Sequence, residues 1–222
     1  MTPTHAPAPR PSPSPRPVVR IVDDDASFLK GTARMLRASG FVVEVFASAE
    51  EFLARPNADV PGCVLVDLQM PGLSGLDLQE ALVQAGQPLP VVFLSGHGNV
   101  PTTVQAMRRG AEDFLTKQAS KEELLAAVKR TLTRDARERA ERARLQQLRA
   151  PFAALTLRDR EVLAHVLAGQ LNKQIASDLG IDERSVKRHR TSIMSKLRVQ
   201  SVAELTRLVQ DAGFWSGGKF VR

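Results

Sequence analysis

Short apolar runs alternate with helical patterns along residues 18–132. The runs that we expect to form strands are residues 17–22, 41–46, 63–67, 91–94 and 113–116. Between them, apolar residues recur at helical spacing, in segments that begin at capping residues or stop at glycine. Strands that alternate with helices predict a parallel sheet covered on both faces. An α/β flavodoxin-like strand order, 2-1-3-4-5, makes the first and third strands neighbours.

Residues 151–222 instead predict a small all-α domain. Four helices are expected to begin near residues 156, 172, 182 and 201, and Gly169 and Gly180 end the first two. The second and third helices are short and are joined by a tight turn that contains glycine. This arrangement is the signature of a helix-turn-helix motif.

The remaining segments are expected to be tails and a linker. The helix that opens at Ser120 continues to about Arg149, and past Leu132 its apolar positions are mostly alanine, which disfavours a strong coiled coil. The N-terminus carries seven prolines and no apolar centre, so it predicts a disordered tail and no secretory signal. We therefore divide the chain into a tail (1–17), an α/β domain (18–132), a helical linker (133–152), a helix-turn-helix domain (153–213) and a second tail (214–222).

The net charge of +7 is distributed unevenly. Residues 18–118 hold 8 basic and 12 acidic residues, whereas residues 151–222 hold 12 basic and 7 acidic residues. A basic second half suggests that it binds a polyanion. No apolar run approaches the roughly 18 residues of a membrane span, so we expect no contact with a membrane. The single cysteine, Cys63, excludes an internal disulfide and favours a reducing compartment, so we expect a cytoplasmic protein.

Chemically useful side chains stand at the ends of the expected strands. They are Asp23, Asp24, Asp67, Ser95 and Lys117. Because the carboxyl ends of parallel strands share one edge of the sheet, these groups should converge there. Clustered carboxylates repel one another unless a cation such as Mg²⁺ neutralises them, and a carboxylate beside a metal suits phosphoryl transfer. Each residue alone could be a turn or surface residue, but the combination favours a site.

The third expected helix of the C-terminal domain has a basic face. Arg184, Lys187, Arg188 and Thr191 lie opposite the apolar residues Val186, Ile193 and Leu197. A basic stripe is often only solvated, but on the second helix of a helix-turn-helix motif it suits the major groove of DNA. We expect His189 to pack against the core, and Arg190 and Lys173 to contact phosphates.

Residues 18–132 resemble the receiver domain of two-component response regulators. The matching motifs are Val22-Asp23-Asp24, Asp67-Leu68-Gln69-Met70-Pro71-Gly72, Ser95-Gly96-His97-Gly98, and Asp113-Phe114 before Lys117. The resemblance implies that Asp67 is the phosphoacceptor and that Mg²⁺ is the cofactor. The implied Mg²⁺ ligands are Asp23, Asp24, Asp67 and the backbone carbonyl of Gln69. Ser95 and Phe114 are the implied switch residues, and Lys117 is the implied phosphoryl-binding cation.

One position departs from the receiver pattern. The family usually has a proline after the lysine, with a cis peptide bond, whereas Gln118 follows Lys117 here. A cis bond before a non-proline residue costs about 2.5–4 kcal/mol, so a trans bond is expected and the placing of Lys117 becomes an open question.

Residues 153–210 resemble the LuxR/FixJ-type output domain. The matching segments are residues 155–163, Asn172-Lys173-Gln174-Ile175-Ala176 and Ser185-Val186-Lys187-Arg188-His189-Arg190. This resemblance places Lys187, Arg188 and Thr191 at base-contacting or groove-facing positions. Together with the His97-Gly98 pattern, the two resemblances point to the FixJ-like subgroup. They imply a transcriptional regulator that a sensor histidine kinase phosphorylates, that pairs as a homodimer and that binds promoter DNA, with RNA polymerase as a further candidate partner.

Other functions fit the sequence less well. A haloacid-dehalogenase-type phosphatase would need a second carboxylate two residues after Asp67, where Gln69 stands, so we expect no enzyme of that type. Gly96 and Gly98 form no G-x-G-x-x-G motif, which disfavours a dinucleotide-binding enzyme. An orphan regulator that binds DNA without phosphorylation is a nearer alternative, and Gln118 is the sequence feature that favours it.

Overall fold

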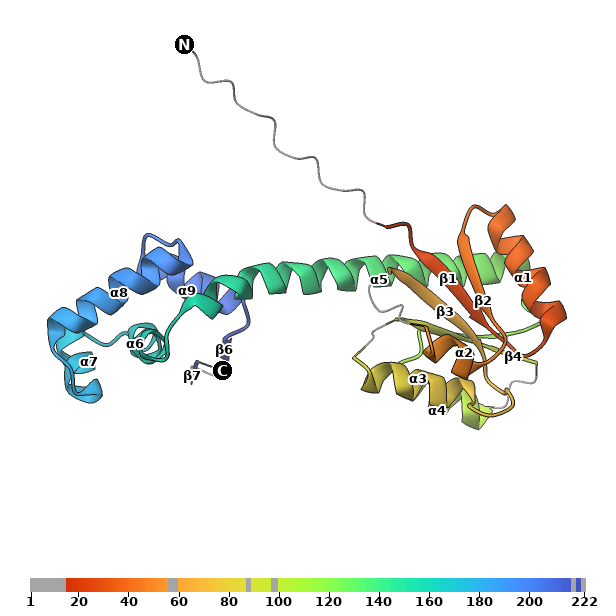
Figure 1. The fold of residues 1–222 in the computed structure, drawn as a ribbon, viewed down its shortest axis with the longest axis horizontal. Helices are drawn as coiled ribbons and strands as arrows, with labels where there is room; N and C mark the ends of the chain where they lie inside the picture. The colour runs from red at the N-terminus through yellow and green to blue at the C-terminus, as the bar shows by residue number, and fades with distance from the viewer. Residues whose placement is uncertain (1–14, 56–59, 87–88, 97–99, 217–218, 221–222) are drawn as a thin grey trace, which may run out of the picture. The chain divides into compact units, whose positions relative to one another are not determined.

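The computed structural model describes residues 15–55, 60–86, 89–96, 100–216 and 219–220 (Figure 1). The chain forms two compact units, Met1–Glu138 and Arg139–Arg222, and each contains its own hydrophobic core. Within the described residues, no helix is both long and apolar enough to cross a membrane. His97 and Gly98, and most of the proline-rich tail, lie outside the described residues.

The first unit is built on a parallel five-stranded sheet with the order β2-β1-β3-β4-β5, as predicted. The strands are β1 (Val18–Val22), β2 (Val42–Phe46), β3 (Gly62–Asp67), β4 (Val91–Ser95) and β5 (Asp113–Thr116). In the register of the sheet, Val22 pairs with Val66, Asp67 with Leu94, and Ser95 with Thr116. The ends of β1, β3, β4 and β5 therefore lie at one edge, as the strand order requires.

Helices cover both faces of this sheet. They are α1 (Ala26–Ala38), α2 (Ala49–Leu53), α3 (Gly75–Gln84), α4 (Val100–Arg108) and α5 (Lys121–Arg149). One core joins the sheet to α1 and α5 through residues such as Leu36 and Val128, and the other joins it to α2, α3 and α4 through residues such as Phe52, Leu78 and Ala106. Because every residue of β1, β3 and β4 is buried, their sequences are continuous runs rather than alternating patterns.

A buried polar network holds α5 against the start of β3. Asp135 of α5 is 1% exposed, and its Oδ2 accepts a hydrogen bond of 2.9 Å from the Gly62 N–H. Arg20 of β1 is fully buried beside it and donates to the carbonyl of Val60 at 3.3 Å. Asp135 falls in the stretch that we expected to be a helical linker, and its buried contact shows that α5 remains packed on the first unit beyond Leu132.

The second unit is a small helical domain. Its elements are η1 (Ala150–Ala154), α6 (Leu157–Leu167), α7 (Asn172–Leu179), α8 (Glu183–Leu197), α9 (Val202–Asp211), β6 (Trp215–Ser216) and β7 (Lys219–Phe220). The four predicted helices are present, and Thr156, Asp182 and Ser201 cap α6, α8 and α9. The 3₁₀ turn η1 and the β6–β7 pair were not predicted.

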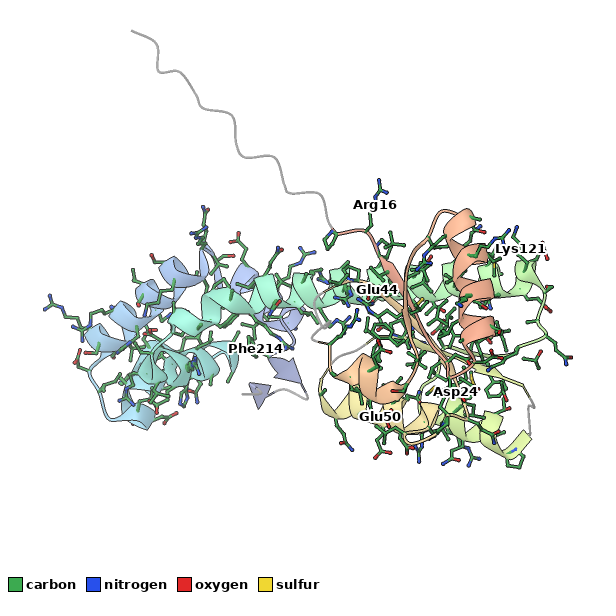
Figure 2. The ribbon with its side chains drawn as sticks, turned by 45° about the vertical axis from the view of Figure 1, so that its right-hand side comes forward. Arg16, Asp24, Glu44, Glu50, Lys121 and Phe214 are labelled. Carbon is green, nitrogen blue, oxygen red and sulfur yellow. The ribbon has the colours of Figure 1, made fainter. Side chains whose placement is uncertain are left out.

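An aromatic contact anchors the chain just beyond α9. The ring of Phe214, which Figure 2 labels, lies just after α9. Its centroid is 4.8 Å from that of the Phe152 ring, in a T-shaped arrangement. The Arg149 guanidinium lies 5.4 Å from the Phe214 centroid, and its Nε donates to the carbonyl of Ala212 at 2.8 Å. The end of α5, η1 and the residues just after α9 therefore share one cluster.

Candidate functional site

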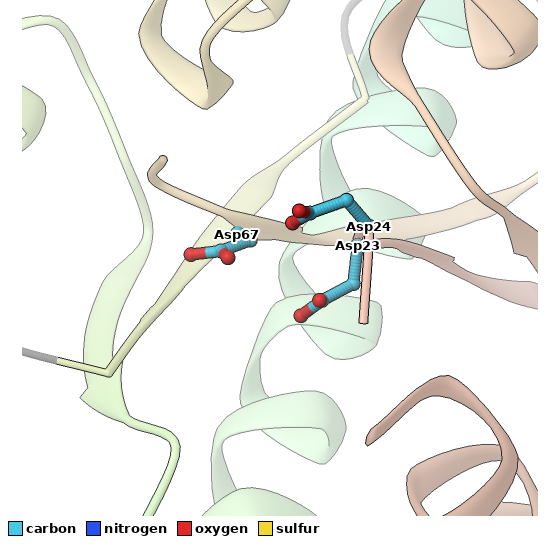
Figure 3. A group of neighbouring side chains, drawn as sticks. All are labelled: Asp23, Asp24 and Asp67. Carbon is cyan, nitrogen blue, oxygen red and sulfur yellow. The ribbon is translucent and has the colours of Figure 1, made fainter. Parts of the chain in front are cut away.

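Three aspartates meet at the carboxyl edge of the sheet (Figure 3). Asp23 and Asp24 follow β1, and Asp67 ends the adjacent strand β3. Carboxylate oxygens from these three residues all lie within 4.8 Å of one another. Asp23 is fully buried and Asp67 is 7% exposed, whereas Asp24 is open to solvent. The predicted cluster is therefore present, with one face accessible.

Lys117 reaches into this cluster from the end of β5. Its Nζ lies 2.9 Å from Asp67 Oδ2 and 2.8 Å from Asp23 Oδ2. Burial acts to lower the pKa of Lys117, but hydrogen bonds to Asp23 and Asp67 outweigh it and raise the pKa above its usual value. No peptide bond of the described residues is cis, so Lys117 takes this position with a trans bond to Gln118.

The donor set fits a hard divalent cation. Burial raises the pKa of Asp23, although hydrogen bonds from Lys117 and from the Asp25 N–H act to lower it. Asp23 Oδ2 is buried and makes no hydrogen bond, although the Lys117 ammonium lies beside it. Among the described residues, Lys117 is the cation paired with these three acids, and one ammonium leaves part of their negative charge uncompensated. Oxygen ligands with excess negative charge are what Mg²⁺ binds.

The other predicted receiver residues stand on β4, on β5 and in the loop after β3. Ser95 ends β4 and is 2% exposed, and its carbonyl accepts a hydrogen bond of 2.8 Å from the Lys117 N–H. Phe114 is half-buried, with its ring 6.4 Å from the Phe93 ring. Gln69 is exposed in the loop after β3, and its N–H donates to Asp67 Oδ1 at 3.3 Å. The fold thus brings together residues far apart in sequence.

The loop between β3 and α3 is held by residues that the sequence did not reveal as part of the site. Glu50, which Figure 2 labels, belongs to α2. Its carboxylate accepts a hydrogen bond of 3.0 Å from the Leu73 N–H. Gly75, the first residue of α3, packs so closely that a Cβ there would lie 2.4 Å from the Asp67 carbonyl oxygen. Both contacts fix the path of the chain just after Asp67.

The second candidate site is the exposed face of α8. Arg184, Lys187, Arg188 and Thr191 are all exposed, and Val186, Ile193 and Leu197 are buried on the opposite side. The Thr191 hydroxyl donates to the Lys187 carbonyl at 3.1 Å, so Thr191 lies one turn beyond Lys187 on the same face. The predicted division of this helix into a basic face and a core face is present.

Residues beside this face have internal partners. The half-buried Arg190 donates to Asn172 Oδ1 at 3.1 Å, and Lys173 is exposed in the first turn of α7. His189 Nδ1 lies 2.8 Å from Asp159 Oδ1, which fits the expectation that His189 packs inward. Asp159, on α6, is 2% exposed and also accepts a hydrogen bond of 2.7 Å from Lys196.

Comparisons with known proteins match both units of the chain. A family model described as "Response regulator receiver domain" matches residues 19–129, and one described as "Bacterial regulatory proteins, luxR family" matches residues 153–209. The response regulator protein TodT of Pseudomonas putida F1 is 40% identical over 193 residues, which cover 87% of this chain and 85% of TodT. The chain belongs to the response regulators with a LuxR-type output domain.

Further relatives of this response regulator match along most of its length. The transcriptional regulatory protein FixJ of Azorhizobium caulinodans is 38% identical over 198 residues, which cover 88% of this chain and 92% of FixJ. The solved structure of the response regulator StyR superposes with a TM-score of 0.76 and 43% identity, and covers 88% of this chain and 98% of StyR. The family membership and the fold class that the sequence predicted are therefore confirmed. The protein is a two-component transcriptional regulator with DNA-binding helices.

Proposed function

We propose that this response regulator is switched by phosphorylation of Asp67 and that the switch controls promoter binding. The arrangement of Asp67, Asp23 and Lys117 carries the proposal. The Lys117 ammonium lies 2.9 Å from Asp67, the proposed attacking carboxylate, and 2.8 Å from Asp23, a proposed metal ligand. The phosphoryl donor is a sensor histidine kinase, the partner that the receiver family implies. We assign the receiver to residues 18–132 and the output domain to residues 153–213, with residues 133–152 as the linker.

In this proposal the residues at the sheet edge divide three tasks: attack on phosphorus, metal binding and hydrogen bonding to the phosphoryl group. Asp67 attacks the phosphorus atom with a carboxylate oxygen, and the bond from phosphorus to the imidazole nitrogen of the kinase's phosphohistidine breaks, with its electron pair left on that nitrogen. Asp23, Asp24, Asp67 and the Gln69 carbonyl would hold Mg²⁺, which would supply positive charge beside the phosphoryl oxygens. Lys117 donates to a phosphoryl oxygen in place of its contact with Asp67, and the Ser95 hydroxyl donates to another.

The switch then passes to the surface and to DNA. Engagement of Ser95 draws Phe114 inward, which changes the surface of α4, β5 and α5 and allows two receivers to pair. The paired output domains place α8 in the major groove, where Arg184, Lys187, Arg188 and Thr191 face bases and backbone, and Lys173 and Arg190 contact phosphates. Because promoter DNA is its target, the protein acts in the cytoplasm. RNA polymerase is a further proposed partner.

The chemical step can be tested directly. The full-length protein is incubated with acetyl phosphate and Mg²⁺, and its intact mass is measured for the wild type, for Asp67→Asn and for the wild type with EDTA. We expect one phosphoryl group on the wild type with Mg²⁺ and none in the other two samples. A wild type that gains no phosphoryl group would support the orphan alternative instead, in which DNA binding is independent of phosphorylation.

The orphan alternative is weakened by the position of Lys117. Gln118 was the feature that favoured it, because a changed loop could move Lys117 away from Asp67. With Gln118 in place, Lys117 Nζ lies 2.9 Å from Asp67 Oδ2. The proposed chemistry therefore does not require a proline at this position.

A further inference from the structure

Lys117 has a third neighbour besides the two acids. Its Nζ lies 4.8 Å from the centroid of the Phe28 ring, which belongs to the first turn of α1. A ring face attracts a cation through its quadrupole, and the attraction grows when water is partly excluded. Phe28 is half-buried, and the Lys117 side chain is 18% exposed, so the contact is partly shielded from solvent.

The position of the Phe28 ring is set from the acidic cluster itself. Asp23 Oδ1 accepts a hydrogen bond of 2.9 Å from the Asp25 N–H, and Asp25 Oδ1 accepts one of 3.1 Å from the Phe28 N–H. Lys117 Nζ then closes the circuit with a hydrogen bond of 3.0 Å to Asp23 Oδ1. The cap of α1 and the cation of the site are therefore parts of one closed set of contacts.

Packing alone does not fix Lys117. A cavity of about 190 Å³ lies between α1 and the residues after β5, with Phe28, Met35, Thr116, Lys117 and Ala119 among its lining. A side chain beside such a space has room to change its rotamer. The ring of Phe28 is thus a specific contact that favours the rotamer in which the ammonium points at the acids.

We propose that Phe28 is a positioning residue for Lys117 and thereby sets how readily the site accepts a phosphoryl group from a small phosphodonor or a kinase. The proposal rests on the proposed phosphorylation of Asp67. A ring contact attracts the charge of the ammonium but leaves its N–H donors for oxygen atoms. Phe28 can therefore hold Lys117 while the ammonium exchanges the Asp67 oxygen for a phosphoryl oxygen.

The test is a double-mutant cycle on the full-length protein. The initial rate of phosphorylation by acetyl phosphate with Mg²⁺ is measured against donor concentration for the wild type, Phe28→Leu, Phe28→Tyr, Lys117→Ala and the Phe28→Leu/Lys117→Ala double variant. Phe28→Leu should lower the rate at subsaturating donor by about threefold to tenfold. Phe28→Tyr, which keeps the ring, should stay within about twofold of the wild type. In the Lys117→Ala background, Phe28→Leu should have no further effect, because the cation it positions is gone.

Met35→Leu serves as the matched control, since it alters the lining of the same cavity from the same helix but removes no aromatic ring, and it should behave as the wild type. Equal rates for Phe28→Leu and wild type would overturn the proposal. So would an equal loss of rate with and without Lys117, which would mean that Phe28 acts only through the fold. A wild type that is never phosphorylated would instead overturn the proposed function, and the positioning role with it.

Discussion

At the scale of single residues, the site depends on a glycine at a position where the surrounding atoms leave no room for a side chain. Gly75 begins α3 directly behind Asp67, and a Cβ at this position would meet the Asp67 carbonyl oxygen at 2.4 Å and the Phe93 ring at 3.0 Å. Backbone cannot move aside as a flexible side chain can. The close approach of α3 to the end of β3 therefore requires glycine.

Two glycine substitutions should consequently have opposite effects. Gly75→Ala should lower the free energy of unfolding by about 1–3 kcal/mol, because the added methyl group displaces the backbone at Asp67. Gly31→Ala in α1, where a Cβ would meet nothing within 4 Å, should raise it by about 0.5–1 kcal/mol. Urea unfolding followed by circular dichroism measures both. A Gly75→Ala variant as stable as the wild type would contradict the close contact.

Asp159 should make the stability of the protein depend on pH. Burial acts to raise its pKa, but hydrogen bonds from Lys196, His189 and Thr156 outweigh it and hold the pKa at about 2, against an ordinary value of 3.8. A carboxylate with a lowered pKa stabilises the fold above its unfolded pKa, and this contribution of about 2 kcal/mol disappears as the pH falls from 3.8 to about 2.

The difference in unfolding free energy between the wild type and Asp159→Asn measures this contribution. It should be constant at neutral pH and should shrink below pH 3.8. Glu204→Gln is the matched control: Glu204 also lies in a first turn, that of α9, but is exposed, so its loss should be small throughout. If the difference in unfolding free energy between the wild type and Asp159→Asn stayed constant down to about pH 2, the charge of Asp159 would contribute nothing to stability.

Sequence reasoning found the chemical groups of the site but not the residues that hold them. Asp23, Asp67 and Lys117 were identifiable because each stands at the end of a strand whose neighbours follow from the strand order. The roles of Phe28 and Glu50 could not be predicted, because each depends on how a helix packs against a loop. The periodic pattern of apolar residues predicts which side of a helix a residue lies on, but not which residue of another element it contacts. The positions of these two side chains required the three-dimensional fold.

At the scale of elements, the best predictions came from strands and helices with a clear apolar pattern, whether buried throughout, as β1, β3 and β4 are, or only in part, as β2 and β5 are. The five strands and the helices α6 to α9 follow from apolar patterns and caps. The turn η1 and the β6–β7 pair are short and carry no periodic pattern, and η1 is fixed by contacts such as that of Phe152 with Phe214. The polar sequence around Asp135 suggested solvent, but one buried hydrogen bond to Gly62 overrides that signal.

The exposed face of α8 yields a prediction about DNA. DNA fragments that the wild type selects from a random pool serve as the probe. Lys187→Ala and Arg188→Ala should each weaken binding by about tenfold. If the lost side chain reads bases, the substitution should reduce the affinity for selected DNA more than for random DNA. If it contacts a phosphate, the substitution should reduce both affinities and lower the slope of log affinity against log salt concentration by about one.

Arg207→Ala on α9 is the control for this prediction, because it removes the same charge from an exposed position that is not on α8. It should change affinity only slightly. If Arg207→Ala weakened binding as much as Lys187→Ala and Arg188→Ala, the effect would be one of net charge, and α8 would not be the DNA-contacting element.

At the scale of the whole molecule, the two parts of the chain carry net charges of opposite sign. The part that holds the acidic cluster carries more acidic than basic residues, and the part that holds α8 carries more basic than acidic residues. In the proposed function, phosphorylation would add negative charge to the first part, and DNA binding would use the positive charge of the second. We propose that phosphorylation of Asp67 changes the affinity with which α8 binds DNA.

The affinity for selected DNA, measured by gel shift with and without acetyl phosphate and Mg²⁺, tests that claim most directly. The wild type should bind more tightly after treatment, and Asp67→Asn should bind equally with and without it. Equal binding by the treated and untreated wild type, under conditions in which its intact mass shows the phosphoryl group, would contradict the account.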